Sequence, residues 1–327
     1  MLAAGTIITL ASHSYRLDAP LASSAYGLVW RAARLPAGPA VALKFVNQAQ
    51  MVQAVPDQRQ RWIDGAHDEL AFLRQLAPWD GRHIVRLLDS GVDAGLPVLA
   101  LELLGGDLGA WVACRRAAGS TVDPLQALVW IGQVNQALAK VHQYGRRHLD
   151  LKPSNLLLSR GARDTTLKLA DFGTSRALAD RAPHPYAGTP HWQAPEQLWA
   201  ATAGHDGSGY VTCAATDYFT LGALLYYLIT GGVPLRFCID AAQAWRQQHG
   251  LANQPAACHT LADDEAALFV RHCDDLPARG AAGHALLLLR TLLAPQPAAR
   301  PPHALAIARL LAAAMAPARR AREQAIA

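Results

Sequence analysis

The feature that most constrains the fold is a change from strand-like to helical sequence patterns at residues 104–107, LGGD. This stretch follows the last strand-like segment of the first part of the chain. Before this point, short apolar segments alternate with turn residues, which is typical of an antiparallel meander. One helical pattern interrupts them at residues 63–76. Afterwards most of the chain has helical periodicity, beginning at an Asp-Pro start signal at residues 123–124. The sequence therefore predicts an α+β fold with a small β-rich lobe and a larger α-rich lobe. The predicted strands are residues 14–22, 27–35, 40–46, 83–91, 96–104, 155–159 and 167–172.

Composition excludes several classes of protein. The formal net charge of +5 comes without a dense Lys/Arg run interleaved with aromatic residues, so we expect no nucleic-acid partner. Five scattered cysteines without metal-ligand spacing favour reduced thiols and a cytoplasmic location. The N-terminus lacks a basic n-region, which argues against a signal peptide. Glycines and a proline interrupt the apolar run at residues 218–235, so we predict a buried core helix and no membrane span.

Several polar residues stand in short motifs whose chemistry suits a metal ion or a buried ion pair. Asp150 and Asn155 stand five residues apart in HLDLKPSN, and Asp171 lies on a Gly turn after the strand-like LKLA. Carboxylate and amide oxygens suit Mg²⁺, which shares its shell with phosphates. Lys44 lies between apolar residues in VALK and needs an anionic partner. Glu69, on the inner face of the helix 25 residues later, can supply it. Each feature alone is weak, but the ordered set is a strong signal.

This ordered set resembles the signature of eukaryotic-type serine/threonine protein kinases of the kind also found in bacteria. The resemblance implies a bilobal protein kinase-like fold over residues 15–315. The lobes would divide near residues 104 and 105, with residues 1–14 as an N-terminal extension and residues 316–327 as a basic tail. The matching positions are Lys44, Glu69, Asp150, Lys152, Asn155, Asp171–Gly173, Gly188–Pro190, Ala194–Glu196, Asp217 and Arg300.

The resemblance implies a role for each polar residue. Lys44 would hold the α- and β-phosphates of ATP and pair with Glu69. Asp150 would accept the proton of the substrate hydroxyl, with Lys152 reaching the γ-phosphate and Thr189 bonding this Asp–Lys pair. The residues implied as ligands of Mg²⁺, or of Mn²⁺ as an alternative, are Asn155 and Asp171. Glu196 and Arg300 would form a buried structural ion pair.

The resemblance also implies a nucleotide pocket. The phosphate-covering loop falls on LASSAYGLV, residues 21–29, where only Gly27 of the three usual glycines remains. Because glycine lets the backbone approach phosphate, we expect weaker nucleotide affinity or a stiffer loop rather than lost binding. Asp107 would meet the ribose, although GGD arrives one residue early. The full set of implied nucleotide contacts is Leu21, Ala22, Ser24, Gly27, Val29, Ala42, Lys44, Leu101, Glu102, Leu104, Asp107 and Leu157.

Leu149 is the second departure from the family pattern, which usually has Arg before the catalytic Asp. That Arg reads a phosphate on the activation segment, the stretch from Asp171–Gly173 to Ala194–Glu196, and a leucine cannot. The middle of the segment, RALADRAPHP, contains no Ser or Thr. The phosphate-binding Arg and a phosphorylatable residue in the middle of the segment are therefore absent together. This predicts a non-RD kinase, one without Arg before the catalytic Asp, that does not depend on activation-segment phosphorylation.

Arg146 and Arg147 stand where the family usually has apolar residues. Two interpretations are open: these side chains face solvent, or they add positive potential near the site.

Three functions remain in competition at this level. The first is an active Ser/Thr protein kinase with protein substrates and a regulatory partner protein. The second is a pseudokinase acting as a nucleotide-binding scaffold or sensor, which the glycine-poor loop favours. The third is a small-molecule phosphotransferase, which Glu196, Asp217 and Arg300 argue against.

Overall fold

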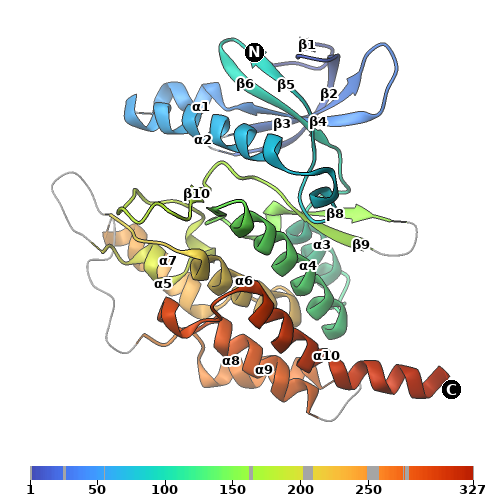
Figure 1. Ribbon diagram of the computed structural model, residues 1–327, viewed down its shortest axis with the longest axis vertical. Coiled ribbons are helices and arrows are strands. Elements are labelled where there is room, and N and C mark those ends of the chain that lie inside the picture. The colour runs from blue at the N-terminus through green and yellow to red at the C-terminus, as the bar shows by residue number, and fades with distance from the viewer. Residues whose placement is uncertain are drawn as a thin grey trace. The chain divides into compact units, whose positions relative to one another are not determined.

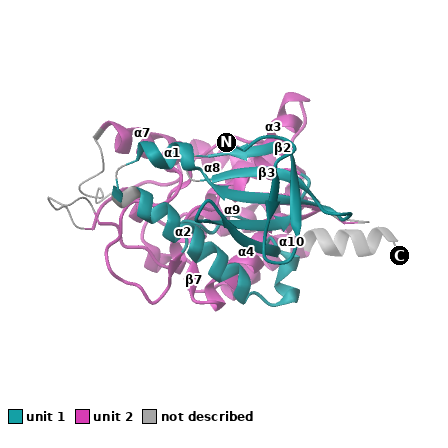
Figure 2. Cartoon of the chain, turned by 90° about the horizontal axis from the view of Figure 1, so that it is seen from above, with its two compact units in different colours: residues 1–105, 170–175 teal, residues 106–169, 176–327 magenta. Residues whose placement is uncertain are grey.

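The computed structural model describes residues 2–24, 27–54, 56–161, 165–201, 209–248, 258–274, 276 and 280–326 (Figure 1). The chain forms two compact units (Figure 2). Unit 1 comprises residues 1–105 together with residues 170–175. Unit 2 comprises residues 106–169 and 176–327. The predicted α+β class is confirmed, with the large sheet in unit 1 and most helices in unit 2.

Unit 1 is built on a six-stranded antiparallel sheet of order β1-β2-β3-β4-β6-β5. Side chains alternate between the faces of each strand, so Val41, Leu43 and Phe45 of β4 enter the hydrophobic core. Lys44 points to the opposite face, beside Val29 and Leu99 in the sheet register. The strands are β1 (Ile7–Thr9), β2 (Ser14–Ser23), β3 (Gly27–Arg34), β4 (Ala40–Val46), β5 (Leu87–Asp93) and β6 (Leu96–Glu102).

The segment predicted as an N-terminal extension adds an edge strand to this sheet. β1 pairs with β2, and Asp89 of β5 fixes the connection between them. The Asp89 carboxylate accepts hydrogen bonds from the backbone N–H of Ser12 and His13 and from the Tyr15 hydroxyl, at 3.0–3.2 Å. Burial would raise the pKa of Asp89, but these donors and the N–H of Ser90 lower it. The N-terminal strand is therefore an integral part of unit 1.

Helix α2 (Pro56–Gln75) packs on the sheet of unit 1. Its buried residues Glu69, Leu70, Phe72 and Leu73 follow helical spacing. Glu69 therefore lies on the inner face, as the sequence predicts. Phe72 meets the fully buried Phe172 of the Asp-Phe-Gly turn with ring centroids 4.6 Å apart. This contact brings residues 170–175 into unit 1. Shorter helices complete the unit: α1 (Gln48–Gln53) and the 3-10 turn η1 (Pro78–Arg82).

Unit 2 is organised around α6 (Ala214–Ile229), the predicted core helix, which is buried along nearly its whole length. Helix α4 (Pro124–Gln143) begins at the predicted Asp-Pro signal, where Asp123 caps the N–H groups of Leu125 and Gln126. Across the described ranges, no helix is both long and apolar enough to cross a membrane. The remaining helices are α3 (Leu108–Ala117), α5 (Pro195–Leu198), α7 (Arg236–Gln248), α8 (Asp263–Cys273), α9 (Ala281–Leu292) and α10 (Ala304–Ile326).

Short strands and 3-10 turns place the stretch HLDLKPSN, residues 148–155, within unit 2. We name it the catalytic loop after the role that the kinase resemblance implies. The turn η2 (Pro153–Asn155) leads into β8 (Leu156–Arg160), which pairs with β9 (Thr165–Leu169). Two further strands, β7 (Arg146–Arg147) and β10 (Arg176–Ala177), pair antiparallel on the other side of the loop. Two more turns are η3 (Pro190–Trp192) and η4 (Pro297–Ala299). In the region predicted as loops around short helices, 241–282, residues 249–257, 275 and 277–279 lie outside the described residues, as do the side chains of the basic tail from residue 317.

Candidate active site

A buried lysine and two carboxylates form the polar centre of unit 1. Lys44 Nζ lies 2.6 Å from Glu69 Oε2 and 2.8 Å from Asp171 Oδ1. The Glu69 side chain is 2% exposed, whereas that of Asp171 is 44% exposed. Burial alone would lower the pKa of Lys44, but the charges of Asp171 and Glu69 raise it above its ordinary value. Lys44 is therefore a fixed cation beside an accessible carboxylate.

Glu69 also holds the Asp-Phe-Gly turn, through its second carboxylate oxygen. Glu69 Oε1 accepts the backbone N–H of Phe172 at 3.2 Å. Asp171 adopts φ 64°, in the left-handed region that few residues other than Gly, Asn and Asp visit. Burial raises the pKa of the Glu69 carboxyl, and Lys44 opposes that shift. One buried carboxylate thus positions both the cation and the turn that presents Asp171.

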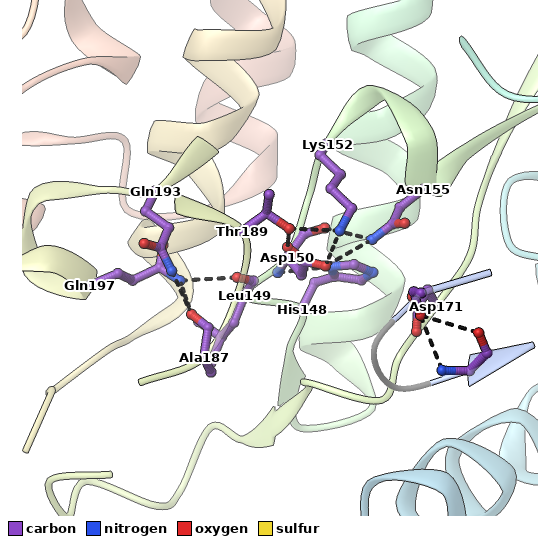
Figure 3. Close-up of polar contacts among 12 residues, drawn as sticks. His148, Leu149, Asp150, Lys152, Asn155, Asp171, Ala187, Thr189, Gln193 and Gln197 are labelled. Atoms are coloured by element: carbon purple, nitrogen blue, oxygen red, sulfur yellow. Dashed lines mark hydrogen bonds and ion pairs between the residues drawn. The ribbon is translucent and has the colours of Figure 1, made fainter. Parts of the chain in front are cut away.

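In unit 2, three side chains converge on the Asp150 carboxylate (Figure 3). Its Oδ1 accepts the Thr189 hydroxyl at 2.7 Å, and its Oδ2 lies 2.7 Å from Lys152 Nζ. Lys152 Nζ also donates to Thr189 Oγ1 at 2.6 Å, which closes a triangle. Asn155 Nδ2 donates to the Asp150 carbonyl at 2.8 Å and to its Oδ2 at 3.2 Å. The predicted contact of Thr189 with the Asp–Lys pair is confirmed.

The catalytic loop is held in a strained conformation by a carboxylate from α6. Leu149 adopts φ 67°, which is costly for a branched side chain. The Asp217 carboxylate compensates by accepting the N–H groups of His148 at 2.9 Å and Leu149 at 2.8 Å. His142 Nε2 lies 2.8 Å from the same carboxylate. Burial would raise the pKa of Asp217, but the hydrogen bonds from His142 and the Leu149 N–H lower it. Asp217 therefore acts as an anionic clamp behind Asp150.

Two glutamines fix the end of the activation segment against the catalytic loop (Figure 3). Gln197 Nε2 donates to the carbonyls of Leu149 at 2.9 Å and Ala187 at 3.2 Å. Gln193 Nε2 donates to the Ala187 carbonyl at 2.7 Å. At Gly188 a Cβ would lie 2.6 Å from the Leu149 carbonyl, so only glycine fits this approach. These contacts place Thr189 against Asp150.

The predicted ion pair between Glu196 and Arg300 is confirmed. It is bidentate, with Arg300 Nη1 and Nη2 at 2.7 and 2.8 Å from the two carboxylate oxygens. Arg300 also donates to the carbonyls of Ala215, Ala294 and Pro295 at 2.8–3.0 Å. Its guanidinium carbon lies 5.0 Å from the centre of the Phe219 ring. The pair ties the end of the activation segment to the core of unit 2.

In the loop predicted to cover phosphate, a serine side chain and backbone groups link the residues on either side of the tip. Gly27 N donates to Ser24 Oγ at 3.0 Å, and Ser24 N donates to the Gly27 carbonyl at 2.9 Å. Asn47 Nδ2 binds the Ser24 carbonyl at 2.7 Å and anchors the turn to the end of β4. These bonds hold the two described ends of the loop together, while its residues 25 and 26 lie outside the described residues. The expectation of weaker nucleotide affinity or a stiffer loop stays a prediction. Leu21 and Ala22 lie exposed on β2.

The other implied nucleotide contacts fall in both units, and their role stays a prediction. Ala42 lies opposite Leu101 in the sheet of unit 1. Glu102 binds the N–H and Nε of Arg86 at 2.9 and 3.3 Å, so its side chain is committed within unit 1. Asp107 Oδ1 caps α3 by accepting the Ala110 N–H at 2.8 Å, a structural role that competes with the implied ribose contact. Leu104 belongs to unit 1, and Leu157 is half-buried on β8 of unit 2.

Comparison with known proteins identifies the family. The family described as protein kinase domain matches residues 15–309, nearly the whole chain. The chain belongs to the protein kinase family. The serine/threonine-protein kinase PkaA of Streptomyces coelicolor is 32% identical over 76% of this chain and 44% of its own length. The serine/threonine-protein kinase Pkn1 of Myxococcus xanthus is 31% identical over 68% of this chain and 29% of its own length.

A solved kinase structure shares the fold. The crystal structure of the Mycobacterium tuberculosis PknI kinase domain, a double mutant, matches with a TM-score of 0.61 and 22% identity. The match covers 96% of this chain and 99% of that one. The chain spans less than half the length of either curated relative named above.

The structure corrects one interpretation and shows residues that sequence reasoning missed. Arg147 is fully buried, so the interpretation that it faces solvent is wrong. Gln193, Gln197 and His142 also escaped notice, because nothing in their local sequence announces long-range partners. Gly65 was missed as well. A Cβ at Gly65 would lie 2.6 Å from the Gly173 carbonyl, so α2 touches the Asp-Phe-Gly turn directly at this point.

Substituting Gly65 with alanine is expected to displace the Asp-Phe-Gly turn and lower kcat by about 10- to 100-fold, because small misplacements of catalytic groups are that costly. The matched control is Gly132→Ala in α4, where no atom lies within 4 Å of the new Cβ. Gly132→Ala should retain activity and gain about 0.5–1 kcal/mol of stability. Steady-state kinetics and urea unfolding check both, and equal kinetics for the two variants would contradict the prediction.

Proposed function

We propose that this chain is an ATP- and Mg²⁺-dependent protein kinase that transfers the γ-phosphate to Ser and Thr hydroxyls of protein substrates. The observation that carries the proposal is the complete polar set, held in specific geometry within each unit. Unit 1 contributes Lys44, Glu69 and Asp171, and unit 2 contributes Asp150, Lys152 and Asn155. Phosphotransfer as proposed uses all six side chains together, and their presence favours activity over the pseudokinase alternative.

Asp150 is suited to orient a substrate hydroxyl and accept its proton. Its carboxylate is held on both oxygens, so its direction is fixed before substrate arrives. Lys152, 2.7 Å from Asp150 Oδ2, would supply positive charge to the transferred phosphoryl group. The Ser/Thr assignment rests on Lys152, which stands where the Ser/Thr branch of the family has lysine. It also rests on the similarity to serine/threonine-protein kinases of Streptomyces coelicolor and Myxococcus xanthus.

The residues implied as metal ligands fit a hard cation. Asn155 uses both amide hydrogens on Asp150, which leaves its amide oxygen as the donor for coordination. Asp171 offers an exposed carboxylate. Oxygen donors of this kind suit Mg²⁺, with Mn²⁺ as the alternative. A bound metal would neutralise phosphate charge, while Lys44 holds the non-transferred phosphates.

The proposal includes independence from activation-segment phosphorylation. Leu149 is 3% exposed and contributes no charge to the segment. Residues 176–185 contain no Ser, Thr or Tyr hydroxyl to modify, and this holds also for Arg176 and Ala177, which pair with β7. We assign the regulatory input to a partner protein. The five cysteines form no disulfide among the described residues, which favours a reducing compartment such as the cytoplasm.

The test compares wild type with Asp150→Ala and Asp171→Ala, using γ-labelled ATP, Mg²⁺ and generic basic proteins. Wild type should label Ser or Thr, and both variants should lose the label. A parallel wild-type sample treated with phosphatase should keep its activity. Equal labelling in wild type and variants would favour the pseudokinase reading. A large loss after phosphatase treatment would reject phosphorylation independence alone.

A further inference from the structure

Arg147 is a buried cation directly behind the catalytic loop. It lies in β7, has no exposed surface, and is the largest fully buried side chain among the described residues. Burial and the nearby Arg176 lower its pKa, yet a guanidinium stays protonated at neutral pH. A buried charge needs strong hydrogen-bond partners. The identity of those partners shows what the residue does.

The partners of Arg147 belong mainly to the activation segment. Nη1 donates to the carbonyls of Ala177 at 2.6 Å and Asp180 at 3.0 Å. Both carbonyls lie in the stretch that begins with β10, the strand paired with β7. Hydrogen bonds from a charged donor are roughly twice as strong as neutral ones. Arg147 therefore binds the backbone of the segment, whatever its side chains.

The third partner extends the contact to His184. Arg147 Nε donates to Thr212 Oγ1 at 2.8 Å, and His184 Nε2 lies 2.8 Å from the same oxygen. His184 Nδ1 lies 2.8 Å from the Pro185 carbonyl, which can only accept, so Nδ1 carries the proton. Nε2 then accepts a hydrogen bond from the Thr212 hydroxyl. One chain of donors thus runs from Arg147 through Thr212 to His184, and all three side chains are buried.

Backbone bonds secure the same stretch at both ends. Leu178 N donates to the Gly145 carbonyl at 2.7 Å. The N–H and carbonyl of His184 pair with Tyr210 at 2.9 Å. Arg176 Nη2 contacts the Asp180 carboxylate at 2.7 Å. Residues 177–184 are therefore fixed from the catalytic-loop side by protein groups alone.

We infer that Arg147 is a positioning residue whose hydrogen bonds hold residues 177–184 of the activation segment in place. We call this set of contacts the lock. It replaces the contact that a phosphorylated segment would make with the usual Arg. Arg147 lies two residues before Leu149, the position where the family usually has the Arg that binds a phosphate. Arg147 binds backbone carbonyls instead. The lock leads into the contacts of Gln193 and Gln197 with Ala187, and these hold Thr189 against Asp150. The inference rests on the proposed function for its consequence on catalysis, but not for the lock itself.

Hydrogen exchange of the full chain tests the lock without reference to activity. The readout is the protection of the backbone amides of Leu178, Asp180 and His184, all of which are hydrogen-bonded. Arg147→Met should raise their exchange rates by about tenfold or more, because two carbonyls and Thr212 lose their donor. Arg147→Lys keeps the charge without the forked geometry and should restore protection only in part. Arg181→Met, an exposed arginine of the same segment, is the matched control and should leave exchange unchanged.

Kinetics then test the consequence. Arg147→Met should lower kcat about tenfold or more. The KM for ATP should change little, because Lys44, proposed to bind the ATP phosphates, belongs to unit 1. Unchanged amide exchange in Arg147→Met would overturn the lock, even if the chain proves to be an active kinase. Raised exchange in a chain without any phosphotransfer would support the lock and reject the proposed function.

A milder variant keeps the test decisive if Arg147→Met does not fold. Thr212→Val removes one hydroxyl and breaks the link between Arg147 and His184. Exchange should then rise at His184 and stay near wild type at Leu178. Equal exchange rates of the His184 amide in Thr212→Val and in wild type would count against the lock.

Discussion

Replacing Lys44 with methionine is expected to lower kcat/KM for phosphotransfer by about 10²–10³-fold, the usual effect of removing one preorganised electrostatic group. Methionine keeps the length of the side chain but not its charge. The change removes the cation 2.8 Å from Asp171 and 2.6 Å from Glu69. Glu69 is then a buried carboxylate whose main remaining donor is the Phe172 N–H. The melting temperature should therefore fall together with the activity.

The matched control for this prediction is Lys140→Met. Lys140 lies on α4 in unit 2, where Nζ contacts Gln143 Oε1 at 3.3 Å on the surface. The same substitution at this position should leave kcat/KM and the melting temperature close to wild type. Glu69→Gln should fall between the two, because Lys44 keeps Asp171 as its partner. Full activity in Lys44→Met would show that the polar centre of unit 1 is not used in catalysis.

Much of this polar centre could be predicted from sequence, because it depends on local periodicity. The alternation of β4 fixes the face of Lys44, and helical spacing puts Glu69 with Phe72 and Leu73 on the inner side of α2. The short spacing of Asp150, Lys152 and Asn155 likewise ensures their proximity. The order of these motifs then identifies the family. Local rules and family order therefore account for the fold class and for most of the site.

The remaining features depend on contacts between residues distant in sequence, which no local pattern encodes. Arg147 looks like a surface arginine until Thr212 and the Ala177 carbonyl surround it. Asp89 reads as an ordinary strand residue, yet it anchors the chain at Ser12 and His13. In each case a polar side chain is buried against backbone groups. The sequence shows that these residues are polar, but only the tertiary structure shows what they satisfy.

Leu149 illustrates how structure changes the meaning of a departure from a family pattern. From sequence it marks a missing phosphate reader. In the structure its backbone, not its side chain, is the functional part, since Asp217 binds its N–H and Gln197 binds its carbonyl. The loop geometry around Asp150 is thus preserved by main-chain contacts that tolerate the loss of an arginine.

Disrupting the Glu196–Arg300 pair is expected to produce the largest loss of stability, about 3–5 kcal/mol for Arg300→Met, because it strands a mostly buried carboxylate. The Arg300 side chain has no exposed surface and that of Glu196 is 12% exposed. Arg300→Met also removes the donor from the carbonyls of Ala215, Ala294 and Pro295. Glu196→Gln leaves those three bonds intact, so its loss should be smaller. Urea unfolding of the full chain, followed by tryptophan fluorescence, measures both.

The double variant Glu196→Gln/Arg300→Met makes this prediction sharper. Once Arg300 is absent, Glu196 is a mostly buried charge without its partner, which is destabilising. Neutralising Glu196 should therefore recover part of the stability lost in Arg300→Met. Arg236→Met is the control, since the contact of Arg236 with Asp264 is exposed on both sides and should contribute little. Strict additivity of the two single changes would show that the pair is not coupled. The ion pair would then serve only to orient the chain around Glu196, and the anchoring of the activation segment would fall to Gln193 and Gln197.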